Sequence, residues 1–237
     1  MSSIILKNLT VDFPIYGAGS RSLKKTFLRS ATGGKVARDA SDKIVVRALD
    51  NINLTLQEGD RVGIYGHNGS GKSTLLKVMA GVYEPVSGSC ETKGRLSSML
   101  NLLLGMHPDS TGYENIFLRG KILGLTPQEI DAITQDVVAF AGLGEYMDMP
   151  LRTYSSGMAM RLGFSVSTAI PADILLMDEW MSVGDAEFME KANARLAALL
   201  DTAKILVLAS HSEETIRKNC NKLIRLDHGQ IVAVEDI

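Results

Sequence analysis

The sequence predicts an α/β fold in which a mixed sheet carries an antiparallel β subdomain and an inserted helical subdomain. Short apolar runs rich in β-branched residues alternate with longer stretches of helical periodicity, which is typical of a parallel sheet covered on both faces. Residues 4–13 and 44–56 instead alternate apolar and polar side chains, as antiparallel strands with one solvated face do. The buried strands are expected at Arg61–Tyr65, Asp173–Asp178, Lys204–Ser210 and Lys222–Asp227.

Composition is that of a soluble globular protein, because 45% of the 237 residues are apolar and 22% are charged. We expect a single unit over residues 1–237, with a helical lobe inserted between about residues 95 and 170. A formal net charge of −2 and an aromatic content of 5% disfavour a nucleic-acid binder. The two cysteines have no metal-type spacing and predict a reduced chain.

Helical periodicity is expected over residues 72–81, 113–142 and 186–201. Pro127 fits the first turn of a helix, with Thr126 as its N-cap. No window is apolar over about eighteen residues, and the first residues lack the pattern of a signal peptide, so we expect no membrane span.

Basic residues are concentrated between Gly17 and Arg47, where eight lysines and arginines stand against two aspartates. We interpret residues 17–44 as a basic insertion, in which Ser22–Ser30 has the pattern of one or two amphipathic helical turns. Such a segment favours a docking surface near anionic lipid headgroups, and a solvated loop is the alternative.

A glycine-rich motif, GHNGSGKS at residues 66–73, fits G-x-x-x-x-G-K-[ST] between a predicted strand and a predicted helix. Its glycines let backbone N–H groups curl around phosphate oxygens, and the helix N-terminus adds a positive end. Lys72 is expected to reach the β- and γ-phosphates, Ser73 to bind Mg²⁺ and Thr74 to support the α-phosphate. A glycine-rich turn without a ligand is the alternative. The predicted nucleotide-binding residues are Gly66, His67, Asn68, Gly69, Ser70, Gly71, Lys72, Ser73 and Thr74.

The run ILLMDE, residues 174–179, predicts a partner for this loop. Apolar residues bury the strand, and Asp178 emerges at its carboxyl end, where open sheets place their ligands. We expect Asp178 to hold Mg²⁺ through water and Glu179 to act as the general base toward the attacking water. The alternative role for these carboxylates is to cap the next helix.

The order of the phosphate loop, YSSGM at 154–158, ILLMDE, SVGD at 182–185 and ASH at 209–211 resembles the ATP-binding cassette (ABC) family of transport ATPases. The resemblance covers essentially the whole chain and implies the cassette form of the P-loop NTPase fold, with ATP and Mg²⁺ as ligands. In that family two cassettes pair head to tail, and a signature loop, usually Leu-Ser-Gly-Gly-Gln, caps the γ-phosphate held by the other cassette. The resemblance therefore implies a homodimer.

In the signature segment, Ser155 and Gly157 match the phosphate-contacting positions of the family, whereas Tyr154, Ser156 and Met158 depart from its commonest pattern. A serine hydroxyl and backbone N–H groups at a helix start form an anion site, which a ligand approaches closely only where side chains are small.

Other positions are carried over one by one from the resemblance. Asp185 would face the partner cassette, and His211 matches the switch histidine that contacts the γ-phosphate. Phe13 and Tyr16 are the candidates for an aromatic side chain that stacks on adenine, although Phe13 also suits a core. The family's glutamine ligand of Mg²⁺ is absent, and Asn101 is the nearest amide.

The segment GMHPDSTGYENI at 105–116, the YSSGM and SVGD motifs and the basic insertion resemble the ATP-binding subunits of polysaccharide exporters, which serve O-antigen, capsule or teichoic acid. This implies a lipid-linked polysaccharide as cargo, two copies of a separate polytopic permease, no nucleic acid, and a peripheral location at the cytoplasmic face of the inner membrane. Since the sequence stops after RLDHGQIVAVEDI, we expect no C-terminal carbohydrate-binding domain. The alternatives are another ABC exporter for lipids or drugs, a non-transport ABC ATPase, and a nucleotide-binding module without hydrolysis.

Overall fold

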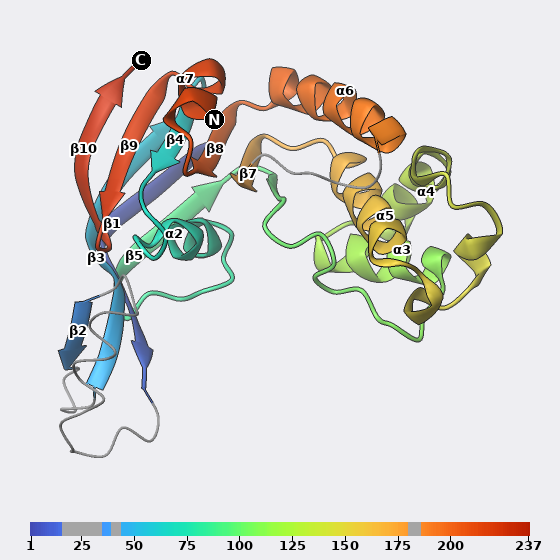
Figure 1. The fold of residues 1–237 in the computed structure, drawn as a ribbon, viewed down its shortest axis with the longest axis horizontal. Helices are drawn as coiled ribbons and strands as arrows, with labels where there is room; N and C mark the ends of the chain where they lie inside the picture. Colours follow the sequence, from blue (N-terminus) through green and yellow to red (C-terminus); the bar gives the residue numbers. More distant parts are fainter. Residues whose placement is uncertain (16–34, 39–43, 180–185) are drawn as a thin grey trace. The chain divides into compact units, whose positions relative to one another are not determined.

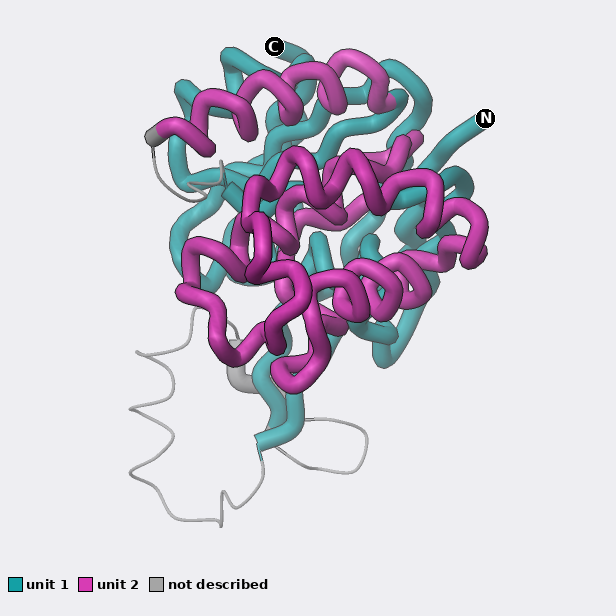
Figure 2. Tube along the Cα trace, turned by 90° about the vertical axis from the view of Figure 1, so that its right-hand side faces the viewer, with its two compact units in different colours: residues 1–96, 176–180, 204–237 teal, residues 97–175, 181–203 magenta. Residues whose placement is uncertain are grey.

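The computed structural model describes residues 1–15, 35–38, 44–179 and 186–237. Two compact units make up the chain (Figures 1 and 2). Unit 1 comprises residues 1–96, 176–180 and 204–237, and unit 2 comprises residues 97–175 and 181–203. Most of the basic insertion, including Ser22–Ser30, lies outside the described residues, and so does the SVGD segment.

Unit 1 contains an antiparallel sheet with the strand order β2-β3-β1-β5 (Figure 1). Its long strands, β1 (Ser3–Pro14) and β3 (Ile44–Gln57), pair antiparallel as the alternating pattern predicts, and β2 (Lys35–Arg38) and β5 (Ser87–Lys93) flank them. One face of the two long strands is buried, which is what a period of two produces. The buried side chains are those of Ile4, Leu6, Leu9, Val11, Val45, Leu49, Ile52 and Leu56.

A second sheet has the order β10-β9-β4-β8-β7-β6. Its strand β4 (Arg61–Tyr65) pairs in parallel with both β8 (Ile205–Ser210) and β9 (Lys222–Asp227). The strand β10 (Gln230–Asp236) pairs antiparallel with β9, so the sheet is mixed. The predicted near-continuous apolar runs are its buried strands. The remaining strands are β7 (Ile174–Asp178) and β6 (Leu96–Ser98), and the boundary between the units crosses both of them.

Two helices of unit 1 position the loops at the end of β4. The helix α2 (Lys72–Met79) contacts β3 and β5 of the antiparallel sheet and β8 of the mixed sheet, with its leucines fully buried. The helix α7 (Glu213–Asn219) contacts β4 and β8. This contact depends on Gly63, because a Cβ atom added there would lie 2.0 Å from Cγ2 of Ile216.

Unit 2 contains the helices α3 (Gly112–Ile122), α4 (Pro127–Ala141), α5 (Ser156–Thr168) and α6 (Ala186–Thr202), with short 3₁₀ turns at Gly144–Asp148 and Leu151–Thr153. The predicted start of α4 is confirmed, since Thr126 caps it in a capping box with Glu129 and Pro127 follows. The apolar core of unit 2 comprises Ile116, Leu125, Ile130, Val137, Ala141, Leu143, Met147, Leu162, Val166 and Ile170.

A buried arginine fixes the loop that precedes α3. The guanidinium of Arg119 donates to Oγ of Ser167 at 2.8 Å and to the backbone carbonyls of Asn101 and Leu104. Burial lowers the pKa of Arg119 to about 10, which leaves the group charged near neutral pH. The same loop crosses α5 closely at Gly163, where an added Cβ would lie 2.5 Å from the carbonyl oxygen of Leu102.

Among the helices of the described residues, none combines the length and the apolar character that a bilayer crossing requires. The longest of them, α6, has 17 residues and includes charged side chains such as Glu187 and Lys191.

We predict that Gly63→Ala lowers the free energy of unfolding by about 1–3 kcal/mol, because the added methyl group overpacks the contact between β4 and α7. Urea unfolding of the single variant and of the double variant Gly63→Ala with Ile216→Ala measures this effect. The loss caused by Gly63→Ala should be smaller in the Ile216→Ala background. An equal loss in both backgrounds would show that Ile216 is not the group that clashes.

Candidate functional site

The glycine-rich loop joins β4 to α2 with a backbone that only glycine adopts easily. Gly69 has φ 84° and Gly71, the N-cap of α2, has φ 110°, and both values lie in the left-handed region. A Cβ atom added at Gly71 would also lie 2.7 Å from the carbonyl oxygen of Ala48. The loop therefore has the tight, side-chain-poor backbone that a phosphate group needs in order to approach N–H groups.

Two polar side chains of this loop have features that fit a polyanionic ligand. The Nζ atom of Lys72 donates to the carbonyl oxygens of Gly66 at 2.7 Å and of His67 at 3.1 Å, although only 8% of the residue is exposed. The hydroxyl of Ser70 is buried and, within the described residues, has no hydrogen-bond partner. Phosphate oxygens accept hydrogen bonds from both kinds of donor. Asn68 and Ser73 are exposed, and Thr74 is half-buried in the first turn of α2.

Glu179 and His211 form a direct pair. The Nδ1 atom of His211 lies 2.6 Å from Oε1 of Glu179, and both side chains are more than half exposed. Glu179 has φ 66°, a left-handed value that costs a residue with a Cβ atom about 1–2 kcal/mol. Its N–H nevertheless donates to the carbonyl of Ala209 at 2.8 Å, which extends the contact between β7 and β8. Asp178 is the half-buried last residue of β7.

The parallel pairing brings these groups to one edge of the mixed sheet in unit 1. Tyr65, the last residue of β4, lies in register with Ser210, the last residue of β8. The residues that follow them, Gly66 and His211, therefore leave the sheet at the same edge, and the backbone contact to β8 holds Glu179 at that edge as well. The loop, the two carboxylates and the histidine come from separate segments of the sequence and belong to one candidate site.

The sequence reasoning missed a neighbour of the loop on β9. The Nε2 atom of His67 lies 3.0 Å from Oδ1 of Asp227, and the ring of His228 is 5.1 Å from the ring of His67 between centroids. The predicted strand at 222–227 ends at Asp227, but only the strand order reveals that it lies beside β4.

Of the two aromatic residues that the sequence predicts to stack on adenine, Phe13 lies within the described residues. Phe13 is 36% exposed near the end of β1, so it is not a core residue, and its ring meets that of Tyr83 edge to face at 5.3 Å. Tyr83, which the sequence reasoning also missed, lies below the ammonium of Lys77 at 5.4 Å. Tyr16 is outside the described residues.

The other predicted site residues belong to unit 2. Ser155 is the exposed N-cap of α5, and its Oγ accepts the N–H of Met158 at 3.2 Å. Apart from its chain neighbours and the backbone of α5, a Cβ atom added at Gly157 would have one atom of the described residues within 4 Å, Oγ of Ser155 at 3.9 Å. The Oδ1 atom of Asn101, the proposed metal ligand, accepts the N–H of Leu103 at 3.1 Å. Asp185 lies outside the described residues.

Tyr154, which departs from the commonest signature, anchors this segment within unit 2. Its hydroxyl donates to the carbonyl of Tyr146 at 2.6 Å, and the ring packs edge to face on that of Tyr146. Burial raises the pKa of the Tyr154 phenol, and the nearby carboxylate of Asp148 adds to the shift. The tyrosine thus links the start of α5 to the 3₁₀ turn at Gly144–Asp148.

A known family model matches a large part of the chain. Residues 49–182 match the model of a family described as ABC transporter. The chain is 43% identical over 231 residues to the O-antigen export system ATP-binding protein RfbE of Yersinia enterocolitica, and the match covers 98% of this chain and 97% of that protein. It is 36% identical to the teichoic acids export ATP-binding protein TagH of Bacillus anthracis over 98% of this chain but only 40% of the relative.

Solved structures share the fold. A dimeric ATP-binding cassette, MJ0796, in a post-hydrolysis state with ADP and Pi aligns over 98% of both chains with a TM-score of 0.69 and 20% identity. An ATP-binding subunit of an ABC transporter aligns over 99% of this chain and 90% of that chain with a TM-score of 0.68 and 18% identity. Both likenesses confirm the predicted α/β cassette fold.

We predict that the left-handed backbone at Glu179 costs stability whatever side chain it carries, glycine excepted. Glu179→Gly should therefore be more stable toward urea than Glu179→Ala by about 1 kcal/mol. Both variants lose the contact with His211, so the difference between them reports the backbone alone. If Glu179→Ala were the more stable variant, the left-handed conformation would not exist in solution.

Proposed function

The chain belongs to the ABC transporter family, and we propose on that premise that it is the ATP-hydrolysing subunit of an exporter of lipid-linked polysaccharide. The observation that carries the catalytic part is the pair of Glu179 and His211, which meets at the same sheet edge as the glycine-rich loop. The relatives named for O-antigen and teichoic acid export carry the transport part.

The residues of the loop fit ATP with Mg²⁺. The buried hydroxyl of Ser70 has no partner in the described part of the chain, and Gly69 and Gly71 have the left-handed backbone that lets loop N–H groups turn toward a phosphate. We propose that Lys72 exchanges the carbonyls of Gly66 and His67 for phosphate oxygens when nucleotide binds. The nucleotide would be held by the whole run from Gly66 to Thr74.

The hydroxyl of Ser73 and the carboxylate of Asp178 would hold Mg²⁺, because hydroxyl and carboxylate oxygens are the ligands this ion prefers. When bound, the ion neutralises phosphate charge. Asn101 is the candidate for a further oxygen ligand, in place of the glutamine of the family. Phe13, with its exposed ring beside Tyr83, and Tyr16 are the candidates for stacking on adenine.

Glu179 would accept the proton of the attacking water as general base. The imidazole of His211 contacts Oε1 of Glu179 at 2.6 Å, which limits the directions in which the carboxylate points. In the proposed cycle His211 also meets the γ-phosphate, so one side chain would link the base to the phosphoryl group that the water attacks. This linkage is the chemical role that we assign to the pair.

The second half of the site would come from another copy of the chain. Ser155 presents its hydroxyl at the N-terminus of α5, and no described residue would clash with a Cβ atom added at Gly157. A glycine in a helix costs about 1 kcal/mol relative to alanine, and no group within the described chain requires it at this position. We infer that a phosphate bound by the partner cassette requires it. Asp185 would face the same partner.

We propose that the chain acts at the cytoplasmic face of the inner membrane with two copies of a polytopic permease. Another ABC exporter for lipids or drugs and a non-transport ABC ATPase are the alternatives. Purification from membranes decides between them: a co-purified permease with lipid-linked glycan, and turnover that this glycan stimulates, supports the proposal. Salt-dependent binding of nucleic acid by the chain would favour a non-transport ATPase instead.

We predict that Glu179→Gln binds ATP as tightly as the parent chain but hydrolyses it about 10²–10⁴-fold more slowly, because an amide cannot accept the proton. The variant should accumulate as a nucleotide-bound dimer. Equilibrium nucleotide binding, phosphate release and size measurements test this. The control is Lys72→Ala, which should lose nucleotide binding itself. Turnover at the parental rate in Glu179→Gln would exclude this residue as the base.

We predict that Gly157→Ala keeps or raises the free energy of unfolding, by up to about 1 kcal/mol, while turnover falls about 10²-fold. Among the described residues the added methyl group would clash with nothing, since its nearest neighbour beyond the adjacent residues and the backbone of α5 is Oγ of Ser155 at 3.9 Å, but it would occupy the space that the partner's phosphate needs. The neighbouring variant Ser156→Ala is the control and should change neither quantity. Parental turnover in Gly157→Ala would remove the helix start from the proposed interface.

A further inference from the structure

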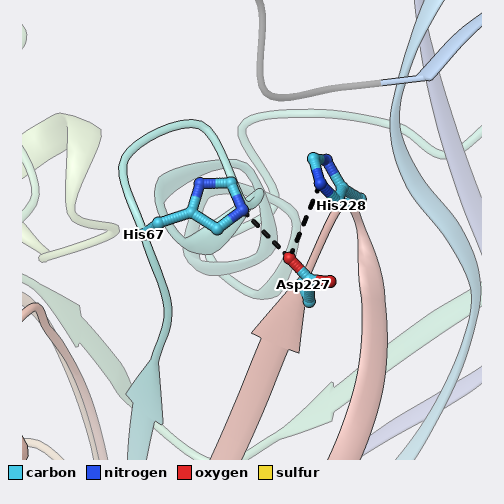
Figure 3. Close-up of side chains that lie close together, drawn as sticks. All are labelled: His67, Asp227 and His228. Atoms are coloured by element: carbon cyan, nitrogen blue, oxygen red, sulfur yellow. Dashed lines mark hydrogen bonds and ion pairs between the residues drawn. The ribbon is translucent and has the colours of Figure 1, made fainter.

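Three side chains from two separate segments of unit 1 converge beside the glycine-rich loop (Figure 3). His67 comes from the loop itself, Asp227 is the last residue of β9, and His228 is the first residue of the turn between β9 and β10. The Nε2 atoms of His67 and His228 lie 3.0 Å and 3.8 Å from the same oxygen, Oδ1 of Asp227. One ligand atom from each of the three residues lies within 4.8 Å of the others.

The ring of His67 is oriented as metal-binding imidazoles are. Its Nδ1 atom lies 2.8 Å from the carbonyl oxygen of Asn68, which only accepts hydrogen bonds. Its Nε2 atom faces a carboxylate oxygen, a second acceptor. A neutral imidazole that donates from Nδ1 presents a lone pair at Nε2, and a cation between this nitrogen and the carboxylate resolves the contact.

His228 occupies an unusual place for a histidine. It has φ 44° and Gly229 has φ 79°, and the pairing of Asp227 with Gln230 makes these two residues the complete loop of a hairpin. Two left-handed residues in such a loop define a type I′ turn, in which Asn or Asp is the usual first residue. The turn brings the imidazole of His228 toward Asp227 at a cost that asparagine would largely avoid.

We propose that His67, Asp227 and His228 form a site for one divalent transition-metal ion of the zinc type. Two imidazole nitrogens and one carboxylate oxygen suit Zn²⁺, whereas Mg²⁺ favours oxygen ligands. All three side chains are about half exposed, which gives an ion a path of entry and leaves room for water as a fourth ligand. Bringing the three atoms to ligand spacing requires only a small movement of exposed side chains.

A bound ion would tie the loop to the hairpin turn. The carbonyl of His67 accepts from Nζ of Lys72 and from the N–H of Ser70, so a restraint on His67 acts on the segment that holds the lysine. None of the three residues is a proposed Mg²⁺ ligand, a role that is assigned to Ser73, Asp178 and Asn101. Metal binding by these three residues does not rest on the proposed function, since it requires neither nucleotide nor partner.

Titration of the full chain, freed of any affinity tag, with Co²⁺ tests the proposal, because this ion takes zinc sites and absorbs visible light when its coordination is tetrahedral. We expect one Co²⁺ per chain, displaced by Zn²⁺. Both His228→Asn and Asp227→Asn should weaken binding at least about tenfold. The asparagine at position 228 suits the turn, so His228→Asn should keep or raise the urea midpoint while it loses the ion.

Two further variants locate the ion. His107 is an exposed histidine of unit 2, and the variant His107→Asn should bind Co²⁺ as the parent chain does. If His211→Asn abolished binding while His228→Asn did not, the ion would lie at the Glu179 pair and the proposal would be overturned. Unchanged affinity in both His228→Asn and Asp227→Asn would overturn it as well.

The two cysteines are poor competitors for the ion. Burial raises the pKa of the Cys90 thiol and raises that of Cys220 to about 12, which disfavours both side chains as thiolate ligands. A second measurement is the midpoint of thermal unfolding. In the parent chain it should rise with Zn²⁺ and return to its metal-free value with a chelator, because an ion that binds only the folded state stabilises it. The same rise in His228→Asn would contradict the assignment.

Discussion

The parallel pairing of β4 with both β8 and β9 is the constraint on which the site depends. Tyr65 lies in register with Ser210 on one side and with Arg225 on the other. Parallel strands end at a common edge, so the glycine-rich loop, His211 and the turn after β9 meet there without any direct sequence link. Buried side chains on both faces of β4 and β8 hold this register, because a shift of one residue would exchange the faces of every side chain. Gly63 allows the covering helix to approach the central strand.

The candidate site also contains three groups of unit 1 with unusual local environments or conformations. Ser70 buries a hydroxyl that has no partner in the described chain, Lys72 directs its ammonium at backbone carbonyls, and Glu179 has a left-handed backbone. The unpartnered hydroxyl and the left-handed backbone each cost free energy in the chain alone. A polyanion offers acceptors to the hydroxyl and the ammonium, and strain held by surrounding structure is typical of sites that bind or react. Left-handed backbone also occurs at Asn8 in β1 and Asn51 in β3, but asparagine adopts this conformation more readily than glutamate does.

The elements that could be predicted from the sequence are those that local signals specify. The strands at 61–65, 174–178, 205–210 and 222–227 and the start of α4 follow from apolar runs and capping residues, which act within a few positions. The order of strands in a sheet depends on long-range packing, and no single motif records it. For that reason the neighbour of His67 on β9 and the contact between Phe13 and Tyr83 were not predicted. The glycine-rich loop was recognisable because its chemistry fixes residue types at close spacing, whereas the ligand role of Asn101 came from resemblance and stays a prediction.

The consensus of the loop leaves position 67 unspecified, and the reason is physical. Backbone N–H groups cradle phosphates, so the motif constrains backbone shape and leaves the side chain of His67 available for other contacts. Here that side chain meets Asp227, while its carbonyl accepts from the lysine of the motif. One residue thus joins two possible ligands, an ion through its ring and a nucleotide through its backbone. If the ion restrains this backbone, thermodynamic reciprocity requires nucleotide to change the affinity for the ion by the same factor that the ion changes the affinity for nucleotide.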